Sequence, residues 1–435
     1  MSGKPEHKPK HKIDQFLENP VYASLGSYNR TFIKDKSITF GFSFQEIKQL
    51  IDMAADLEMW QEGALSSIWN EADTEKLKGK NLRQRLIRRA VEQWKYLKNT
   101  SNDYSRFTPA KLPAPKLEFI HQTDNSIILG SCPVASEKTR CCNLLTLDAV
   151  KNCGFGCSYC SIQPFYTEGK IFLHDNLRSK LEGLCLDPDE IHHIGTGQSS
   201  DSLMWGNRNG LFDDLFYFAS KNKNVILELK TKSNVIAYFR TNPVPANVIV
   251  TWSLNTDEII SAEEHHTASL HQRISAARAV ADQEILVGFH LHPIVEYKGW
   301  EAGYHQVVDL ILSTFRPEEV ALVSLGTLTF IKPVIKLLRK RKLKSKILQM
   351  PLEDAGGKLS YPLELKQRLF SWVYDRFPQD WKQEVFFYMC MEDNSLWQDV
   401  FGRAYGSNQE FEADMKAHYM EKIRTKHPPG FPRAR

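Results

Sequence analysis

Several β-rich stretches of this 435-residue chain alternate polar with apolar residues, and this alternation restricts the fold more than any other feature of the sequence. Successive side chains of a strand point to opposite faces, so each stretch has one apolar and one polar face. The polar faces of three stretches carry the following residues: Glu228, Lys230 and Lys232; Thr251, Ser253 and Asn255; Gly288, His290 and His292. Because parallel strands are normally apolar on both faces, the pattern indicates either a barrel that holds a polar ligand or a sheet with one half-exposed face.

The stretches with strand character follow residue 116, and helical stretches separate them. The predicted strands span residues 144–148, 191–195, 225–231, 248–255, 285–295, 320–325 and 385–391. Such alternation of strands and helices is typical of βαβ units, which build a parallel sheet or a barrel. We therefore predict an α/β fold with a partial (β/α) barrel.

The first part of the chain has a different pattern. Residues 1–38 contain several lysines but little apolar periodicity, which predicts a basic, partly disordered arm. Ser43 and Glu46 form a capping box ahead of apolar residues at helical spacing, and a second helix is predicted over 74–97. Prolines between residues 109 and 115 then interrupt the chain. We predict four regions: the arm 1–38, a helical region 39–116, the barrel 117–400 and a C-terminal extension 401–435.

The composition excludes several classes of protein. With 42% hydrophobic and 25% charged residues, the chain resembles globular proteins rather than disordered or fibrous ones. No apolar run approaches the roughly 20 residues of a membrane helix, and the N-terminus lacks the apolar segment of a signal peptide, so we expect a soluble cytoplasmic protein without membrane contacts. The net charge of +4 is too small to predict nucleic-acid binding by itself.

The eight cysteines are too few for a disulfide scaffold, and six of them fall between Cys132 and Cys160. Cys153, Cys157 and Cys160 have C-x3-C-x2-C spacing on a loop that contains two glycines. Three thiolates suit a zinc site that takes a fourth ligand from elsewhere, or an iron-sulfur cluster with one iron left uncoordinated. Three buried structural cysteines are the remaining alternative. The other three cysteines of the group match no cluster spacing, and we interpret them as structural.

The cysteine loop resembles that of the radical S-adenosylmethionine (SAM) enzymes, which share its spacing and have an aromatic residue just before the third cysteine, here Tyr159. The resemblance implies a 4Fe-4S cluster bound by Cys153, Cys157 and Cys160, with SAM chelating the fourth iron. It also implies reductive cleavage of SAM to a 5'-deoxyadenosyl radical, with electrons from a donor such as a flavodoxin or ferredoxin.

Within that superfamily, residues 117–400 are most similar to the spore photoproduct lyase family. The matching stretches are 193–197, 229–233, 251–255, 288–290, 293–294, 299–300, 324–327 and 388–392. The resemblance implies that Ser253, Asn255 and one of Lys230 and Lys232 contact SAM, and these residues are also on the polar faces of the strands. It implies a lyase that repairs a DNA lesion. Family chemistry on RNA or protein, and a metal-binding module without catalysis, are the alternatives.

The chain departs from the family pattern at two positions. The cysteine that donates hydrogen in the family should follow the Gly-Thr-Gly stretch, where this chain has Gln198. Ser161 stands where a tyrosine often follows the third cysteine. An amide cannot replace a thiol as a hydrogen-atom donor, so Cys390, on the same strand face as Tyr388, is a candidate donor, with Tyr159 as a second possible relay. The alternative is that Cys390 is an ordinary core residue.

Two further groups of residues bear on the substrate. His290 and His292 share a strand face, and we expect substrate contacts there rather than metal ligation. Two basic runs are solvated helix faces or a surface for nucleic acid. One run consists of Arg83, Arg85, Arg88, Arg89 and Lys95, and the other of Lys332, Lys336, Arg339, Lys340, Arg341, Lys342, Lys344 and Lys346.

Overall fold

The computed structural model describes residues 11–100, 102–109, 111–132, 139–341 and 343–427. Two compact units divide these residues. The first contains the described residues up to Lys111 together with Glu296–Lys298 and Phe330–Glu353. The second contains Leu112–Val295, Gly299–Thr329 and the described residues from Asp354 onward. The break at residue 111 lies close to the boundary expected near 116.

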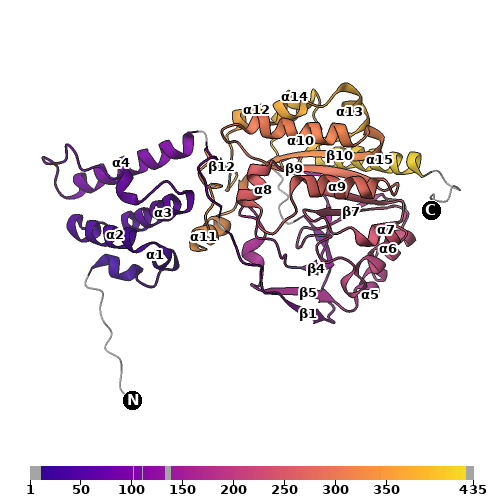
Figure 1. Ribbon diagram of the computed structural model, residues 1–435, viewed down its shortest axis with the longest axis horizontal. Helices are drawn as coiled ribbons and strands as arrows, with labels where there is room; N and C mark the ends of the chain where they lie inside the picture. The colour runs from indigo at the N-terminus through magenta and orange to yellow at the C-terminus, as the bar shows by residue number, and fades with distance from the viewer. Residues whose placement is uncertain (1–10, 101, 110, 133–138, 342, 428–435) are drawn as a thin grey trace, which may run out of the picture. The chain divides into compact units, whose positions relative to one another are not determined.

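The first unit is helical (Figure 1). Its helices are η1 (Lys12–Phe16), α1 (Pro20–Ser24), α2 (Ser27–Phe40), α3 (Phe44–Trp60), η2 (Leu65–Ile68), α4 (Gly79–Asn99) and α11 (Lys332–Lys340). The capping box at the start of α3 is confirmed, because the Ser43 side chain accepts from the Glu46 N–H and the Glu46 carboxylate accepts from the Ser43 N–H.

Part of the expected arm is helical, because α1 and α2 begin within it, with Asn19 capping α1 and Pro20 at its first position. One expectation for this unit is wrong. The second predicted helix begins at Gly79 and not at residue 74, because Lys78 is extended and a turn precedes it. The lysines of the expected arm at positions 4, 8 and 10, and Lys342 of the basic run, lie outside the described residues.

The second unit is built on an eight-stranded sheet of order β14-β10-β9-β8-β7-β6-β3-β2. The strands are β2 (Leu129–Ser131), β3 (Leu145–Leu147), β6 (His192–Thr196), β7 (Val225–Thr231), β8 (Val248–Ser253), β9 (Leu286–Ile294), β10 (Val320–Thr327) and β14 (Phe386–Met389). All neighbours are parallel except the antiparallel pair β2 and β3. The seven predicted strands are confirmed, as is the α/β partial barrel.

Helices cover this sheet (Figure 1). They are α5 (Leu177–Glu182), η4 (Arg208–Gly210), α6 (Leu211–Lys221), α7 (Ala237–Thr241), α8 (Asp257–Glu263), α9 (Leu270–Ala281), α10 (Trp300–Thr314), η5 (Pro317–Glu319), α12 (Leu363–Tyr374), α13 (Gln379–Glu384), α14 (Ser395–Phe401) and α15 (Asn408–Lys426). α9 packs on β8 and β9, and α12 packs on β10. Tyr419 of α15 packs edge-on against His193, a neighbour of Glu228, so α15 covers part of the polar face.

A second sheet, of order β1-β5-β4, supports the cysteine loop. Its strands are β1 (Glu118–Gln122), β4 (Val150–Lys151) and β5 (Lys170–His174), and the loop between β4 and β5 contains the three cysteines and η3 (Gln163–Phe165). The remaining short strands are β11 (Thr329–Phe330), β12 (Glu353–Ala355) and β13 (Lys358–Ser360). None of the helices in the described residues has both the length and the apolar character needed to cross a bilayer.

Candidate active site

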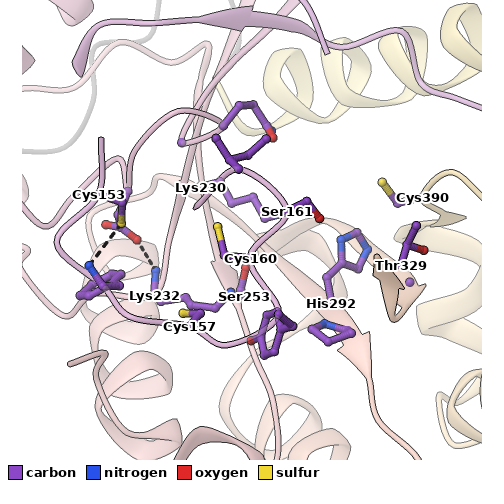
Figure 2. Close-up of a pocket in the computed structure, with 18 of the residues that line it drawn as sticks. Cys153, Cys157, Cys160, Ser161, Lys230, Lys232, Ser253, His292, Thr329 and Cys390 are labelled. Atoms are coloured by element: carbon purple, nitrogen blue, oxygen red, sulfur yellow. Dashed lines mark hydrogen bonds between the residues drawn. The ribbon is translucent and has the colours of Figure 1, made fainter. Parts of the chain in front are cut away.

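One cavity of about 260 Å³ brings all of the predicted site residues except Asn255 together at the C-terminal ends of the strands. The residues of the lining that the following argument uses are Cys153, Cys157, Tyr159, Cys160, Ser161, Gln198, Lys230, Lys232, Ser253, His292, Thr329 and Cys390. Figure 2 shows the three cysteines of the loop on one side of the cavity and Thr329 and Cys390 on the other. In barrels of this kind, active sites lie at the C-terminal ends of strands.

The cysteine loop is tied to the segment between α8 and α9 by backbone hydrogen bonds. The N–H of Gly156 donates to the carbonyl of His265 over 3.0 Å, and the N–H of Ser158 donates to that of Glu263 over 2.8 Å. The loop passes close to Met204 and Trp205 at Gly154, where a Cβ would lie 2.6 Å from Cε of Met204 and 3.0 Å from the Trp205 ring, so the Met204 side chain would have to move to admit one. These contacts fix the direction in which the thiols point.

Tyr159 is held by a buried acid. Its hydroxyl donates to the carboxylate of Glu264, and its ring lies 5.6 Å from Nζ of Lys232. Burial, together with the Glu264 charge, raises the pKa of the Tyr159 phenol well above its usual value. The phenol therefore keeps its proton at neutral pH.

The donor set of the loop fits a cluster or a soft metal. Burial raises the pKa of the Cys153 thiol, and it raises that of Cys157 to about 12. Buried thiols of this kind are protonated unless a metal cation stabilises the thiolates. Within the described part of the chain, no three His, Cys, Asp or Glu side chains are arranged as a complete metal site. The fit therefore rests on donor type and on the shared cavity.

Asp201 organises the strand ends beside the loop. Its buried carboxylate accepts from the Thr231 hydroxyl and from the backbone N–H of Lys232, both over 2.7 Å. It also accepts from the N–H groups of Leu203 and Met204. The sequence did not single out Asp201, although it is the only charged residue of the polar run 198–202.

Of the predicted SAM contacts, Lys230, Lys232 and Ser253 line the cavity. Burial lowers the pKa of the Lys230 ammonium. Asn255 is absent from the lining: its side-chain N–H donates to the Pro293 carbonyl over 2.9 Å, and its oxygen accepts from the Tyr304 hydroxyl over 2.8 Å. The polar face thus extends to Ser253 at the end of β8, and Asn255 turns into the protein.

Both departures from the family pattern, Gln198 and Ser161, lie in this cavity, and so does Cys390. Burial raises the pKa of the Cys390 thiol to about 12, so its S–H bond is intact at neutral pH. His292 also lines the cavity, whereas His290 is buried below it against Glu228. The sequence placed Glu228 on the polar face but did not assign it a role.

The family model described as "Spore photoproduct lyase" matches residues 196–360. Two curated proteins of that name are similar in sequence. The one from Clostridium acetobutylicum is 23% identical over 171 residues, which are 37% of this chain and 50% of the relative. The one from Geobacillus sp. is 26% identical over 132 residues, which are 30% of this chain and 36% of the relative. The chain thus spans about half or less of the length of these relatives.

Solved structures of spore photoproduct lyase have the same fold. The lyase complexed with dinucleoside spore photoproduct superposes with a TM-score of 0.54 at 17% identity, covering 70% of this chain and 94% of that one. A mutant with bound AdoMet and dinucleoside spore photoproduct gives a TM-score of 0.52 at 18% identity, covering 62% and 82%. These matches confirm the partial barrel of the radical SAM type, and with the family model they confirm the resemblance to the spore photoproduct lyase family.

Proposed function

We propose that this spore photoproduct lyase-like chain is a cytoplasmic radical SAM enzyme that acts on a base lesion in DNA. The observation that carries the proposal is the shared cavity: the three thiols of the radical SAM motif face the polar ends of β7 and β8 across a single space. The solved lyases that share the fold were crystallised with AdoMet and with dinucleoside spore photoproduct. Both kinds of ligand are therefore natural candidates for this cavity.

Cys153, Cys157 and Cys160 would hold a 4Fe-4S cluster. When bound, the cluster with SAM supplies reductive cleavage of a sulfonium and thereby a carbon-centred radical. The chain contributes the thiolates, the loop that passes close to Met204 at Gly154, and the cavity that these groups share. A flavodoxin or ferredoxin is the proposed electron donor.

Lys230, Lys232 and Ser253 would bind the charged amino acid end of SAM. A carboxylate in a confined site is stabilised by cationic and hydroxyl donors, and charge-assisted hydrogen bonds are the stronger ones. The Asp201 carboxylate accepts a hydrogen bond from the backbone N–H of Lys232 and thereby fixes the backbone at this position. Asn255 would act on the same site only indirectly, by fixing the Pro293 carbonyl and the Tyr304 hydroxyl.

Cys390 would donate the hydrogen atom that ends the reaction on the substrate. Gln198 lies in the cavity but has no thiol, whereas Cys390 lies there with its S–H bond intact. Tyr159, whose phenol also keeps its proton, is the second candidate relay. Replacing Cys390 by Ala should leave SAM cleavage intact and raise the share of aborted products. Unaltered product ratios would exclude Cys390 as the donor.

Anaerobic reconstitution with iron and sulfide, followed by an assay for 5'-deoxyadenosine, tests the proposal. Dithionite and SAM are supplied with and without dinucleoside spore photoproduct. We expect 5'-deoxyadenosine, formed faster when the dinucleoside is present. Bound iron without SAM cleavage would favour the metal-binding module, and cleavage that the lesion does not affect would favour RNA or protein as the substrate.

A further inference from the structure

A chain of hydrogen bonds runs from buried Glu228 to the ring of His292, which lines the cavity. Oε1 of Glu228 lies 2.7 Å from Nε2 of His290, and Nδ1 of His290 lies 2.6 Å from Oγ of Ser324. Oγ of Ser324 lies 2.9 Å from Nε2 of His292. Glu228, His290 and Ser324 are at most 3% exposed. The chain therefore crosses β7, β9 and β10 below the cavity, out of contact with bulk water.

The direction of the first bond follows from the charge of Glu228. Burial acts to raise the pKa of this carboxyl, but hydrogen bonds to His193 and His290 hold it well below its usual value. An ionised carboxylate can only accept. His290 must therefore donate its Nε2–H, as the Thr251 hydroxyl does over 2.8 Å.

The directions of the His290–Ser324 and Ser324–His292 hydrogen bonds follow because a neutral imidazole and a hydroxyl each carry one proton that they can donate. Burial lowers the pKa of His290 to about 4, and the Lys230 charge acts in the same sense, so the ring is neutral and its Nδ1 accepts. Ser324 donates its only hydroxyl proton to that nitrogen. The oxygen of Ser324 must then accept from Nε2–H of His292.

His292 is consequently left with an unprotonated Nδ1. Burial and the charges on Lys230, His290 and Lys232 lower its pKa well below the usual value, against the weaker opposing effect of Glu228. No residue in the described part of the chain is hydrogen-bonded to Nδ1, and Nδ1 is not among the buried polar atoms that lack a partner. Since the ring lines the cavity, Nδ1 is open to it.

We propose that Nδ1 of His292 accepts a hydrogen bond from the substrate, and that Glu228, His290 and Ser324 are positioning residues that fix this tautomer. The proposal rests on the proposed function and names a substrate group, the imide N–H of a pyrimidine lesion. In Figure 2, His292 lies towards Thr329 and Cys390 rather than towards Cys153. The acceptor and the candidate hydrogen donor thus line the same cavity.

The tautomer can be measured without cofactor or substrate, from ¹⁵N chemical shifts of histidine-labelled protein at neutral pH. We expect the proton of His292 on Nε2. In Glu228→Gln, an amide nitrogen at the position of Oε1 would donate to Nε2 of His290 and reverse every bond in the chain, whereas an amide oxygen there would accept and keep the tautomers. The ¹⁵N shifts of His290 show which orientation is present, and the protons of His290 and His292 should change position together. A wild-type proton of His292 on Nδ1, or a variant in which only one of the two rings changes tautomer, would overturn the proposed chain of hydrogen bonds.

Two further variants keep the test decisive if Glu228→Gln does not fold. Ser324→Ala removes the link and should give His292 a mixture of tautomers. Thr251→Val is the matched control. It removes the hydroxyl that donates to the same carboxylate oxygen and that lies 3.1 Å from Nε2 of His290, but the bonds from Glu228 through His290 and Ser324 to His292 remain, so the tautomer should not change. A single Nε2–H tautomer in Ser324→Ala, or a mixture in Thr251→Val, would contradict the proposed path.

Binding of dinucleoside spore photoproduct, measured by calorimetry, tests the substrate role. If Glu228→Gln reverses the tautomer, we expect it to weaken binding about tenfold or more, because a donor then faces the substrate N–H. Ser324→Ala should weaken binding less, by about three- to tenfold. Equal affinity in wild type and a tautomer-reversed variant would overturn this inference alone. No binding by the wild type would count against the proposed function as well. The ¹⁵N measurement tests the chain of hydrogen bonds from Glu228 to His292 independently of substrate binding.

Discussion

The sequence suggests a functional role both for the polar face of the large sheet and for the basic run that includes α11. In the structure, the two groups of residues make different contacts. On the sheet, Lys230, Ser253 and His292 converge on one cavity. In the first unit, Arg339 instead binds Asp56 through two hydrogen bonds of 2.8 Å and pairs with Asp52 over 3.2 Å. One set of polar groups faces a space for a ligand, and part of the other holds its own unit together.

The difference has a physical cause. A polar residue on a buried strand is costly to desolvate unless a partner or a ligand satisfies it, so several such residues on one face indicate a site. The buried charges of the basic run are instead satisfied by acids of their own unit, so they need no ligand. Lys346, which is 5% exposed and binds Glu62 over 2.6 Å, is a second example from the same run. Period-two polarity is therefore the stronger functional evidence in this chain.

The largest expected effect tests the ligand side of the comparison. Cys157→Ala leaves two thiolates for a cluster that needs three, so bound iron and SAM cleavage should both be lost. Cys185→Ala is the matched control, because Cys185 is an exposed cysteine outside the loop. Iron content and 5'-deoxyadenosine yield are the measurements. Full cleavage by the Cys157 variant would show that the site is misassigned.

The next prediction tests the structural side. Arg339→Ala would leave the Asp56 carboxylate, 1% exposed, with Trp94 as its partner over 3.2 Å. Breaking a buried pair in this way typically costs about 3–5 kcal/mol of unfolding free energy. The neighbouring, exposed Lys340→Ala should change it by less than about 0.5 kcal/mol. Denaturant unfolding of both variants measures the difference, and similar losses would remove the distinction drawn here.

Much of the fold could be predicted because its signals are local. The strands repeat every two residues, and Ser43 with Glu46 marks a helix start within four positions. The helices α1 and α2 have weaker signals, because α1 is only five residues long and α2 buries few residues, among them Ile33.

The sequence predicted the inward-facing residues of the site only where they lie on strands. Ser253 is the last residue of β8, so alternation no longer assigns a face to Asn255. The partners Glu264 and Asp201 were not predicted, because their contacts join distant segments: Tyr159 and Glu264 are 105 residues apart. Such pairings are set by tertiary packing, which a single sequence does not display.

Ser253 and Asn255 give a prediction of intermediate size that tests this limit. Ser253→Ala should weaken SAM binding by roughly 1.5 to 3 kcal/mol, as loss of a charge-assisted hydrogen bond does, with little change in stability. Asn255→Ala should show the opposite pattern, with unfolding free energy lower by about 1–3 kcal/mol because the Tyr304 hydroxyl loses its acceptor. Equilibrium dialysis with SAM and thermal unfolding separate the two. Stronger loss of SAM affinity in the Asn255 variant would restore it as a direct contact.

The smallest effect concerns the part of the basic run that remains available for nucleic acid. Lys332, Lys336 and Lys340 are exposed and four residues apart, so they form one ridge of α11. If each contacts a phosphate of duplex DNA, replacing all three by Gln should lower the slope of log affinity against log salt by about 0.9 per contact. Arg339 is left unchanged, since its loss would destabilise the unit.

A charge-matched control decides whether the ridge itself is responsible. Lys12, Lys34 and Lys223 are exposed lysines outside both basic runs, and replacing these three by Gln removes the same positive charge. Because counterion release counts only cations that neutralise phosphates, the control should keep the wild-type slope while the ridge variant flattens it. If both triple variants lower the slope of log affinity against log salt equally, the three lysines of the ridge contribute only through net charge and not through specific phosphate contacts. Absence of both DNA and RNA binding by the wild-type protein at low salt would favour a protein substrate. It would leave α11, like Arg339 within it, with a structural role.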